Sequence, residues 1–305
     1  MWFKNIRLYS FAEGYTADPD MLEQSLQAHP FQPCGKAERS RAGWVSPLDT
    51  SAQGDDATML THRLGTYVMV CLRKEERILP ASVINDTVNE QVREIEARHD
   101  RKVYRKEKLQ LKDDAIATLL PRAFTRNRVV FAYLDLNDGL LVVNASSASL
   151  AEELISALRD ALGSFPVKLL DVQHAPMAVL TQWLRDHQAS DHFMIDQDCE
   201  LVNPLEDGNV IRCKAQDLSA EEISVHLDAG KQVKKLGVVW NDAVRCLISA
   251  DLTLGRVRFE DRVLEHAQES DPESAAQQFD QDFAVMALEL SGLFNSLFSA
   301  FGGRQ

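Results

Sequence analysis

A basic stretch near the middle of the chain constrains what this sequence can form. Between Arg93 and Arg128 there are 11 Lys or Arg residues and 6 Asp or Glu residues, a local net charge of +5. The whole chain carries −13, so the remainder carries −18. An acidic protein repels a polyanion unless its cations are segregated, so such a stretch indicates a partner-binding surface. On pattern alone, a solvated helix face and contact with a polyanion both remain open.

The same region is predicted to project from the body of the protein. No Gly or Pro occurs in residues 81–118, and apolar residues from Ile84 to Ile95 recur at helical spacing. Beyond Ala97 this apolar face fades. A helix without an apolar face is not held in a core, so we interpret 80–118 as a protruding helical arm.

The rest of the chain mixes strands and helices, which predicts an α+β fold with two mixed α/β subdomains. Residues 1–79 and 119–175 are predicted to form a central domain, interrupted by the arm. Residues 176–305 are predicted to form a C-terminal domain with a terminal helix. Within the first domain, Asn137-Asp138-Gly139 is a hairpin signal between two apolar runs, and Gly163 is placed to end a helix.

The C-terminal part has its own start and stop signals. Ser219 and Glu222 have the spacing of a capping box. Three strands are predicted at 232–240, 243–250 and 255–259. A terminal helix is predicted from Asp271-Pro272 onward, with Phe, Leu or Met on one broad stripe. An intrachain core and a subunit interface are equally compatible with that stripe.

Cysteine usage and hydropathy predict a cytoplasmic protein without a membrane segment. The five cysteines are scattered and none forms a C-x-x-C pair, which indicates reduced thiols. No run of consecutive apolar residues approaches the roughly 20 that a membrane helix needs. The N-terminus lacks the apolar segment and cleavage site of a signal peptide.

Motifs for catalysis or cofactor binding are absent or weak. The chain has neither a phosphate-binding G-x-x-x-x-G-K-[ST] nor a G-x-G-x-x-G motif, and no zinc spacing of Cys and His. Two Asp-His pairs, at 186–187 and 191–192, are conceivable metal ligands, but a solvated surface is favoured. Asp135 and Asp138 are conceivable nuclease carboxylates, but a hairpin turn explains them more simply. We therefore expect no catalytic residue, metal or cofactor.

Short segments throughout the chain share the pattern of one bacterial family. They are Met1–Asn5, Phe31–Gly35, Gly43–Pro47, Arg73–Pro80, Leu119–Phe124, Leu205–Arg212, Ser219–Ile223 and Phe279–Phe283. Because they occur in the same order over essentially the whole chain, the sequence resembles the bacterial recombination-associated protein RdgC.

The resemblance implies a non-enzymatic nucleoid protein that forms a ring-shaped homodimer with a positively charged central hole. It implies binding to double-stranded DNA with little sequence preference, and also to single-stranded DNA, together with restraint of the RecA recombinase. Cations on an inner surface and acids outside would reconcile this with the overall negative charge. Two other classes stay open: a metal-dependent nuclease, and a scaffold whose arm binds an acidic protein.

The resemblance also implies roles for particular residues. The DNA contacts it implies are Arg77, Arg122, Lys214, Gln216 and Lys231. Ala215 stands where relatives often carry another Lys, which predicts weaker contact at that point. For the homodimer, one contact is expected around Phe124, which the pattern alone allows to be either buried or exposed. The other is expected in the C-terminal domain, at Phe283, Leu290 and Leu297.

Overall fold

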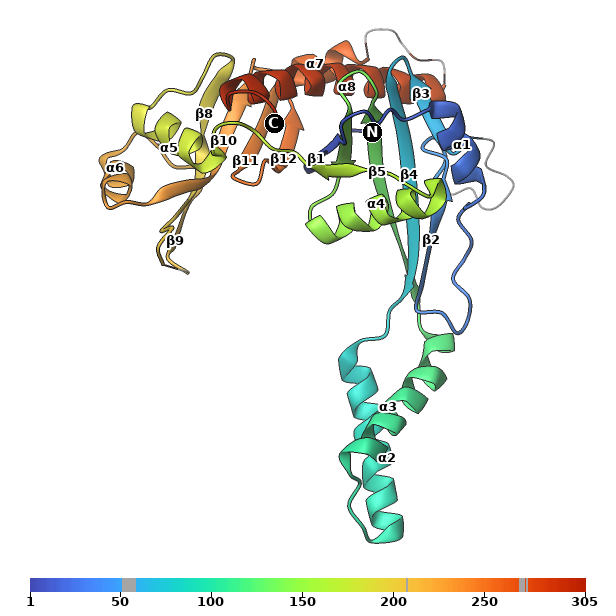
Figure 1. The fold of residues 1–305 in the computed structure, drawn as a ribbon. Helices are drawn as coiled ribbons and strands as arrows, with labels where there is room; N and C mark the ends of the chain where they lie inside the picture. Colours follow the sequence, from blue (N-terminus) through green and yellow to red (C-terminus); the bar gives the residue numbers. More distant parts are fainter. Residues whose placement is uncertain (51–58, 207, 269–271, 273) are drawn as a thin grey trace.

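The structure is a computed structural model that describes residues 1–50, 59–206, 208–268, 272 and 274–305 (Figure 1). Its elements, in chain order, are β1 (Ile6–Phe11), α1 (Pro19–Gln27), β2 (Ser40–Val45), β3 (Thr61–Leu64), β4 (Tyr67–Arg77), α2 (Ala81–His99), α3 (Arg105–Leu119), the 3₁₀ turn η2 (Leu120–Arg122), β5 (Thr125–Asp135), β6 (Leu140–Asn144), α4 (Ala148–Leu162), β7 (Val167–Leu169), α5 (Pro176–Asp186), β8 (Phe193–Val202), β9 (Val210–Cys213), α6 (Glu221–Asp228), β10 (Gln232–Trp240), β11 (Val244–Ser249), β12 (Leu254–Phe259), α7 (Asp261–His266) and α8 (Ala275–Ala300). The predicted α+β class is confirmed.

One antiparallel sheet runs through the whole chain. Its order is β2-β4-β5-β6-β1-β12-β11-β10-β8-β9, with β3 beside β4 and β7 beside β1. β1 joins the two halves, because it pairs with β6 over residues 6–10 and with β12 at the Ile6–Leu254 position. The sheet therefore continues across the predicted boundary at residue 175, and the division into domains stays a prediction.

The long helix α8 packs one face of this sheet and forms the main core. In Figure 1 it runs across both halves of the sheet. Its apolar stripe joins a cluster that includes Phe3 and Tyr133 from the N-terminal half and Leu236 from the C-terminal half. Burying each large apolar side chain contributes about 1.5–3 kcal/mol, so α8 holds the two halves in one body. On the other face of the N-terminal half, α1 and α4 cover a second cluster.

Helix α8 is long and apolar enough to span a membrane by length and composition, which the lack of a long consecutive apolar run did not predict. The helix has 26 residues and is interrupted by few charges, although its apolar residues are not consecutive. Eight of its side chains are buried in this chain, including Met286 and Phe294. A core helix passes the same test, and this burial identifies α8 as one.

The predicted arm is a hairpin of two helices, α2 and α3, that projects from the end of strands β4 and β5 (Figure 1). A small cluster around Ile84, Val88 and Ala115 holds the two helices together. Helix α2 ends at Asp100, which adopts the left-handed conformation with φ 46°. The contact between α2 and α3 therefore stabilises the arm, although its apolar face fades beyond Ala97.

Some local predictions are wrong. The hydroxyl of Ser219 donates to Asp217 at 2.6 Å, and α6 begins after Ala220 without a side-chain cap, so the capping box does not form. Helix α8 begins at Ala275, capped by Ser274, rather than at Pro272; Asp271 lies outside the described residues. Strands β3 and β8 were not predicted. In β8 the reason is its many polar residues, which resemble those of a loop.

Candidate nucleic-acid interface

The face of β10–β12 opposite α8 is lined by cations, and we call it the open sheet face. Its cationic side chains are Arg212 from β9, Lys235 from β10, Arg245 from β11 and Arg256 and Arg258 from β12. Successive side chains of a strand point to opposite faces of the sheet, which places these cations on one face. In β11, for example, Val244, Cys246 and Ile248 are buried in the core while Arg245 is exposed.

A β-bulge adds one cation to this face. The β11–β12 register slips between Arg245 and Leu247, so β12 carries one extra residue there. At this point Arg256 adopts φ 52°, a left-handed conformation that is uncommon for residues other than Gly. A bulge re-aims a side chain, and here Arg256 and Arg258 are both exposed while Val257 between them is buried.

Carboxylates position these cations. Arg245 bonds Asp196 at 2.9 Å, and Arg256 bonds Asp198 at 2.5 Å. Glu200 accepts from Arg212 at 3.0 Å and lies 3.5 Å from Lys235. Burial raises the pKa of Glu200, but the Arg212 hydrogen bond and the Lys235 charge outweigh it, so the pKa is lowered overall. These cations are held in place yet remain partly open to solvent.

Open cavities follow this face from β9 toward β1. One, of about 690 Å³, is lined by Arg7, Lys234, Lys235 and Arg256, among others. Two smaller ones, of about 320 and 240 Å³, lie beside it and share Arg256. Lys and Arg around open hollows suit the phosphate groups of a polyanion.

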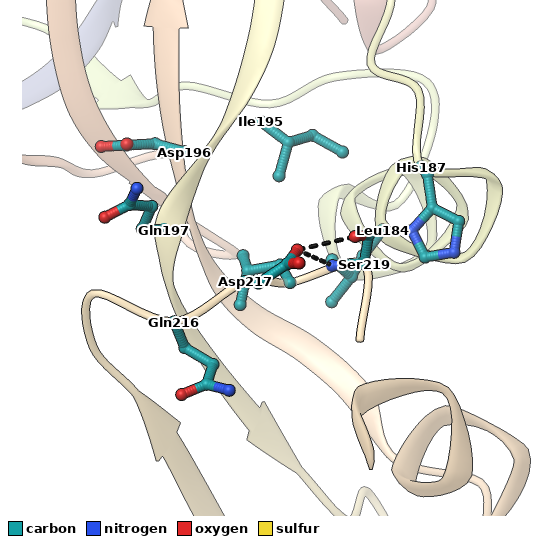
Figure 2. A pocket seen from close by; sticks show the side chains of 9 residues that line it. Leu184, His187, Ile195, Asp196, Gln197, Gln216, Asp217 and Ser219 are labelled. Carbon is teal, nitrogen blue, oxygen red and sulfur yellow. Dashed lines mark hydrogen bonds between the residues drawn. The ribbon is translucent and has the colours of Figure 1, made fainter. Parts of the chain in front are cut away.

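The predicted contacts Lys214 and Gln216 lie in the turn after β9. Ala215, between them, has φ 48°, and its N–H donates to Asp198 at 3.0 Å. The Gln216 amide donates to Glu222 at 2.6 Å, and Gln216 borders a cavity of about 320 Å³ with Asp217 and Ser219 (Figure 2). Lys214 itself is exposed. The fixed turn therefore presents the Lys214 cation to solvent.

Lys231 is the residue before β10. It lies near the start of β9, whereas Lys214 follows the end of that strand. Its ammonium donates to the side chain of Asn209, just before Val210. Val210 pairs with Val202 of β8, which in turn pairs with Gln232. Lys231 is level with Asn209, five residues before Lys214, so the two lysines are roughly 17 Å apart along the strand direction.

Arg77 and Arg122 lie elsewhere, at the base of the arm. The Arg77 guanidinium donates to the carbonyls of Gly35 at 3.3 Å and Ala123 at 3.1 Å, so it ties the arm to the sheet. Arg122 is exposed in η2. The structure therefore does not gather the five predicted contacts: three lie around β9 and two at the arm base.

Phe124 lies beside Arg122 and is 85% exposed, the exposed alternative of the two that the sequence allowed. The residues that follow it, from Thr125 to Val129, are exposed as well. Across the ribbon of β4 and β5, Arg126 is paired with Glu76. A large aromatic side chain flanked by Arg122 and Arg126 is a small apolar contact point in cationic surroundings.

Phe283, Leu290 and Leu297, the other predicted dimer contacts, lie in the core of their own chain. Their exposed fractions are 1%, 0% and 0%. Phe283 packs against the rings of Tyr67 and Tyr133. The intrachain packing that the sequence left open is thus present, and a subunit contact through α8 stays a prediction.

The conceivable catalytic carboxylates have structural roles. Asp135 accepts the N–H groups of Asn137 and Asp138 at 3.0 and 3.1 Å, so it closes the β5–β6 turn. Two of the conceivable metal ligands also have partners within the chain. Asp186 accepts a hydrogen bond from Gln182, and His192 contacts Asn241. Within the described ranges, no group of three or more His, Cys, Asp or Glu side chains is arranged to hold a metal ion.

None of the cations of the open sheet face was among the contacts predicted from the sequence: Arg212, Lys235, Arg245, Arg256 and Arg258. The sequence did indicate that two of these cations share a face, because Arg256 and Arg258 flank a single apolar residue in the predicted last strand. What the sequence did not show was which strands lie side by side. The open sheet face exists only because β8–β12 bring these cations together.

Comparison with known proteins places this α+β chain, with its cationic sheet face, among recombination-associated proteins. A family model described as "Putative exonuclease, RdgC" matches residues 1–304. The recombination-associated protein RdgC of Pseudomonas paraeruginosa is 43% identical, that of Pseudomonas putida 41%, and that of Psychromonas ingrahamii 40%. Each match covers all of this chain and 98–99% of the relative. The chain belongs to the RdgC family.

Proposed function

We propose that this chain is a DNA-binding protein that contacts duplex DNA without reading its sequence. The observation that carries the proposal is the open sheet face with the neighbouring Lys214 and Lys231, in a chain whose net charge is −13. Cations fixed along a surface neutralise phosphates, and counterion release then supplies the affinity. Phosphate contacts carry no sequence information, so unrelated duplexes should bind alike, and single strands should bind as well.

The proposed assembly is a homodimeric ring around DNA. Two subunits close a ring only if they touch at two places, because one two-fold contact leaves an open arc. Phe124, exposed at the base of the arm, supports one of these contacts. Such a ring in the nucleoid would cover DNA that the RecA recombinase otherwise uses, and this would restrain recombination. The relatives are named recombination-associated proteins, which supports a role in recombination.

A second candidate is a metal-dependent nuclease; the description of the matching family names an exonuclease. The two candidates differ in what happens to end-labelled duplex DNA. Incubation with the protein, with and without magnesium, is followed by native and denaturing gels. DNA binding with intact strands supports the proposed function, and shortened strands in magnesium would establish the nuclease instead. Absence of both binding and cleavage would leave the scaffold class, with an acidic protein partner.

Single alanine variants test the interface itself. Arg122→Ala, Lys214→Ala and Lys231→Ala should weaken binding to all duplexes alike. Each should flatten the plot of log affinity against log salt by about 0.9 per lost phosphate contact. Lys36→Ala, an exposed lysine in the loop before β2, serves as the control. Salt slopes that are unchanged in all three variants would remove these residues from the interface.

A further inference from the structure

Two cysteines face each other at the edge of the sheet, next to the predicted DNA contact. Cys199 of β8 and Cys213 of β9 are direct partners in the antiparallel register. The two thiols are close enough that, after burial, Cys213 is the next cause that raises the pKa of Cys199. Cα atoms of directly opposed residues lie about 4.5–5.5 Å apart, within the roughly 4.4–6.8 Å that a disulfide spans.

Cys213 differs from the other four cysteines in access to solvent. Cys199 is 3% exposed, whereas Cys213 is half-buried, and both border an open cavity of about 320 Å³ that Arg212 and Lys214 also line. Cys71 and Cys246 are buried in the sheet, and burial raises the pKa of both thiols. A reagent in solution therefore reaches Cys213 first.

We propose that Cys199 and Cys213 form a reversible disulfide when the protein meets a peroxide, which makes this edge of the sheet an oxidative modification site. β9 has only four residues and lies at the end of the strand order, so it can adjust to a cross-link. Cys213 directly precedes Lys214, so the bond would tie the start of the Lys214–Gln216 turn to β8.

With hydrogen peroxide as the oxidant, the reaction balances in two steps. The Cys213 sulfur attacks one peroxide oxygen, the O–O bond breaks, and the departing hydroxide takes the thiol proton to become water. This leaves a sulfenic acid on Cys213. The Cys199 sulfur then attacks the Cys213 sulfur, the S–O bond breaks, and the Cys199 proton leaves with that hydroxide as a second water. Two electrons have passed from sulfur to the peroxide.

The second step should depend on pH. Burial, and then the neighbouring Cys213, raise the pKa of Cys199 to about 12. The thiolate is the attacking form, so little of it is present at neutral pH and closure of the disulfide is slow. We expect closure to accelerate about tenfold per pH unit below that pKa, and the pair to stay reduced in the absence of oxidant.

Peptide mapping of the whole protein tests the proposal without any variant. The protein is treated with hydrogen peroxide, alkylated with N-ethylmaleimide under denaturing conditions and digested with trypsin. Cleavage after Arg185, Arg212 and Lys214 releases residues 186–212 with Cys199, and the dipeptide Cys213-Lys214. A disulfide-linked product of these two peptides, absent without peroxide and removed by dithiothreitol, is the expected result.

Two variants sharpen the test. Cys213→Ser should abolish the linked product, whereas Cys246→Ser, which changes a buried cysteine of β11, should retain it. If peroxide leaves Cys199 and Cys213 separately alkylated, or converts Cys213 to sulfinic acid without a link, the proposal is wrong. The result does not depend on whether the chain binds DNA.

Discussion

Gly292 of α8 lies against the indole ring of Trp240 of β10. A β-carbon built at Gly292 would come 2.8 Å from Cη2 and 3.1 Å from Cζ2 of Trp240. Trp240 is 6% exposed and belongs to the main core. The absence of a side chain at Gly292 therefore sets how closely α8 approaches the C-terminal half of the sheet.

Gly292→Ala tests this close approach. In an exposed helix, Gly→Ala stabilises by about 1 kcal/mol, but here the added methyl group overpacks the core at a cost of about 1–3 kcal/mol. We expect a net loss in the free energy of unfolding, measured by urea denaturation. Asn295→Ala, at an exposed position of the same helix, is the control and should not lower stability. A Gly292→Ala protein as stable as the wild type would show that the two elements can separate freely.

Leu290→Asp should unfold the protein. Leu290 is fully buried in its own chain, and an unpaired charge at such a site costs several kcal/mol. Leu288→Asp is the matched control, since Leu288 lies two residues away on the same helix and is 63% exposed. Circular dichroism should show loss of structure in the first variant only. A folded Leu290→Asp protein would contradict the core assignment of α8.

Phe124→Ala should leave the fold and the proposed dimer intact but weaken the proposed ring. The side chain is 85% exposed, so its truncation should change the free energy of unfolding by less than about 0.5 kcal/mol. We expect light scattering to show a dimer. We also expect the variant to dissociate from circular duplex DNA faster than the wild-type protein does. Leu205→Ala, which also truncates an exposed apolar side chain, should behave like the wild type. A monomeric Phe124→Ala protein would place the main subunit contact at this residue.

Glu200→Gln should remove a contribution to stability that depends on pH. The folded-state pKa of Glu200 is lowered, so its charge stabilises the fold above the pKa of an unfolded glutamate, about 4.3, and less as the pH falls through the folded value. At pH 7 the variant should lose about 1 kcal/mol, and the difference should shrink below about pH 4. Urea denaturation at several pH values measures this, with the exposed Glu265→Gln as control. A difference that grows on acidification would refute the assigned role.

Local features of the chain were determined by the sequence alone. Asp18 and Pro19 start α1, and Ser147 caps α4. Gly163 ends α4 and the turn before Leu140 joins β5 to β6, as the sequence predicted. Each of these depends on residues within a few positions of one another, such as a cap, a left-handed Gly or a tight turn. Such interactions are complete within a short segment, so a sequence pattern is enough to identify them.

The candidate interface was decided by the tertiary structure. Asp196 and Arg245 are 49 residues apart and meet only because β8 and β11 flank β10 in one sheet. The left-handed Arg256 is held where β12 meets the N-terminal segment, through the bond from Val257 N–H to the Lys4 carbonyl. Long-range strand pairing, not local preference, sets which cations share a face. For the same reason, the apolar stripe of α8 could be read as core or interface until the sheet that it covers was known.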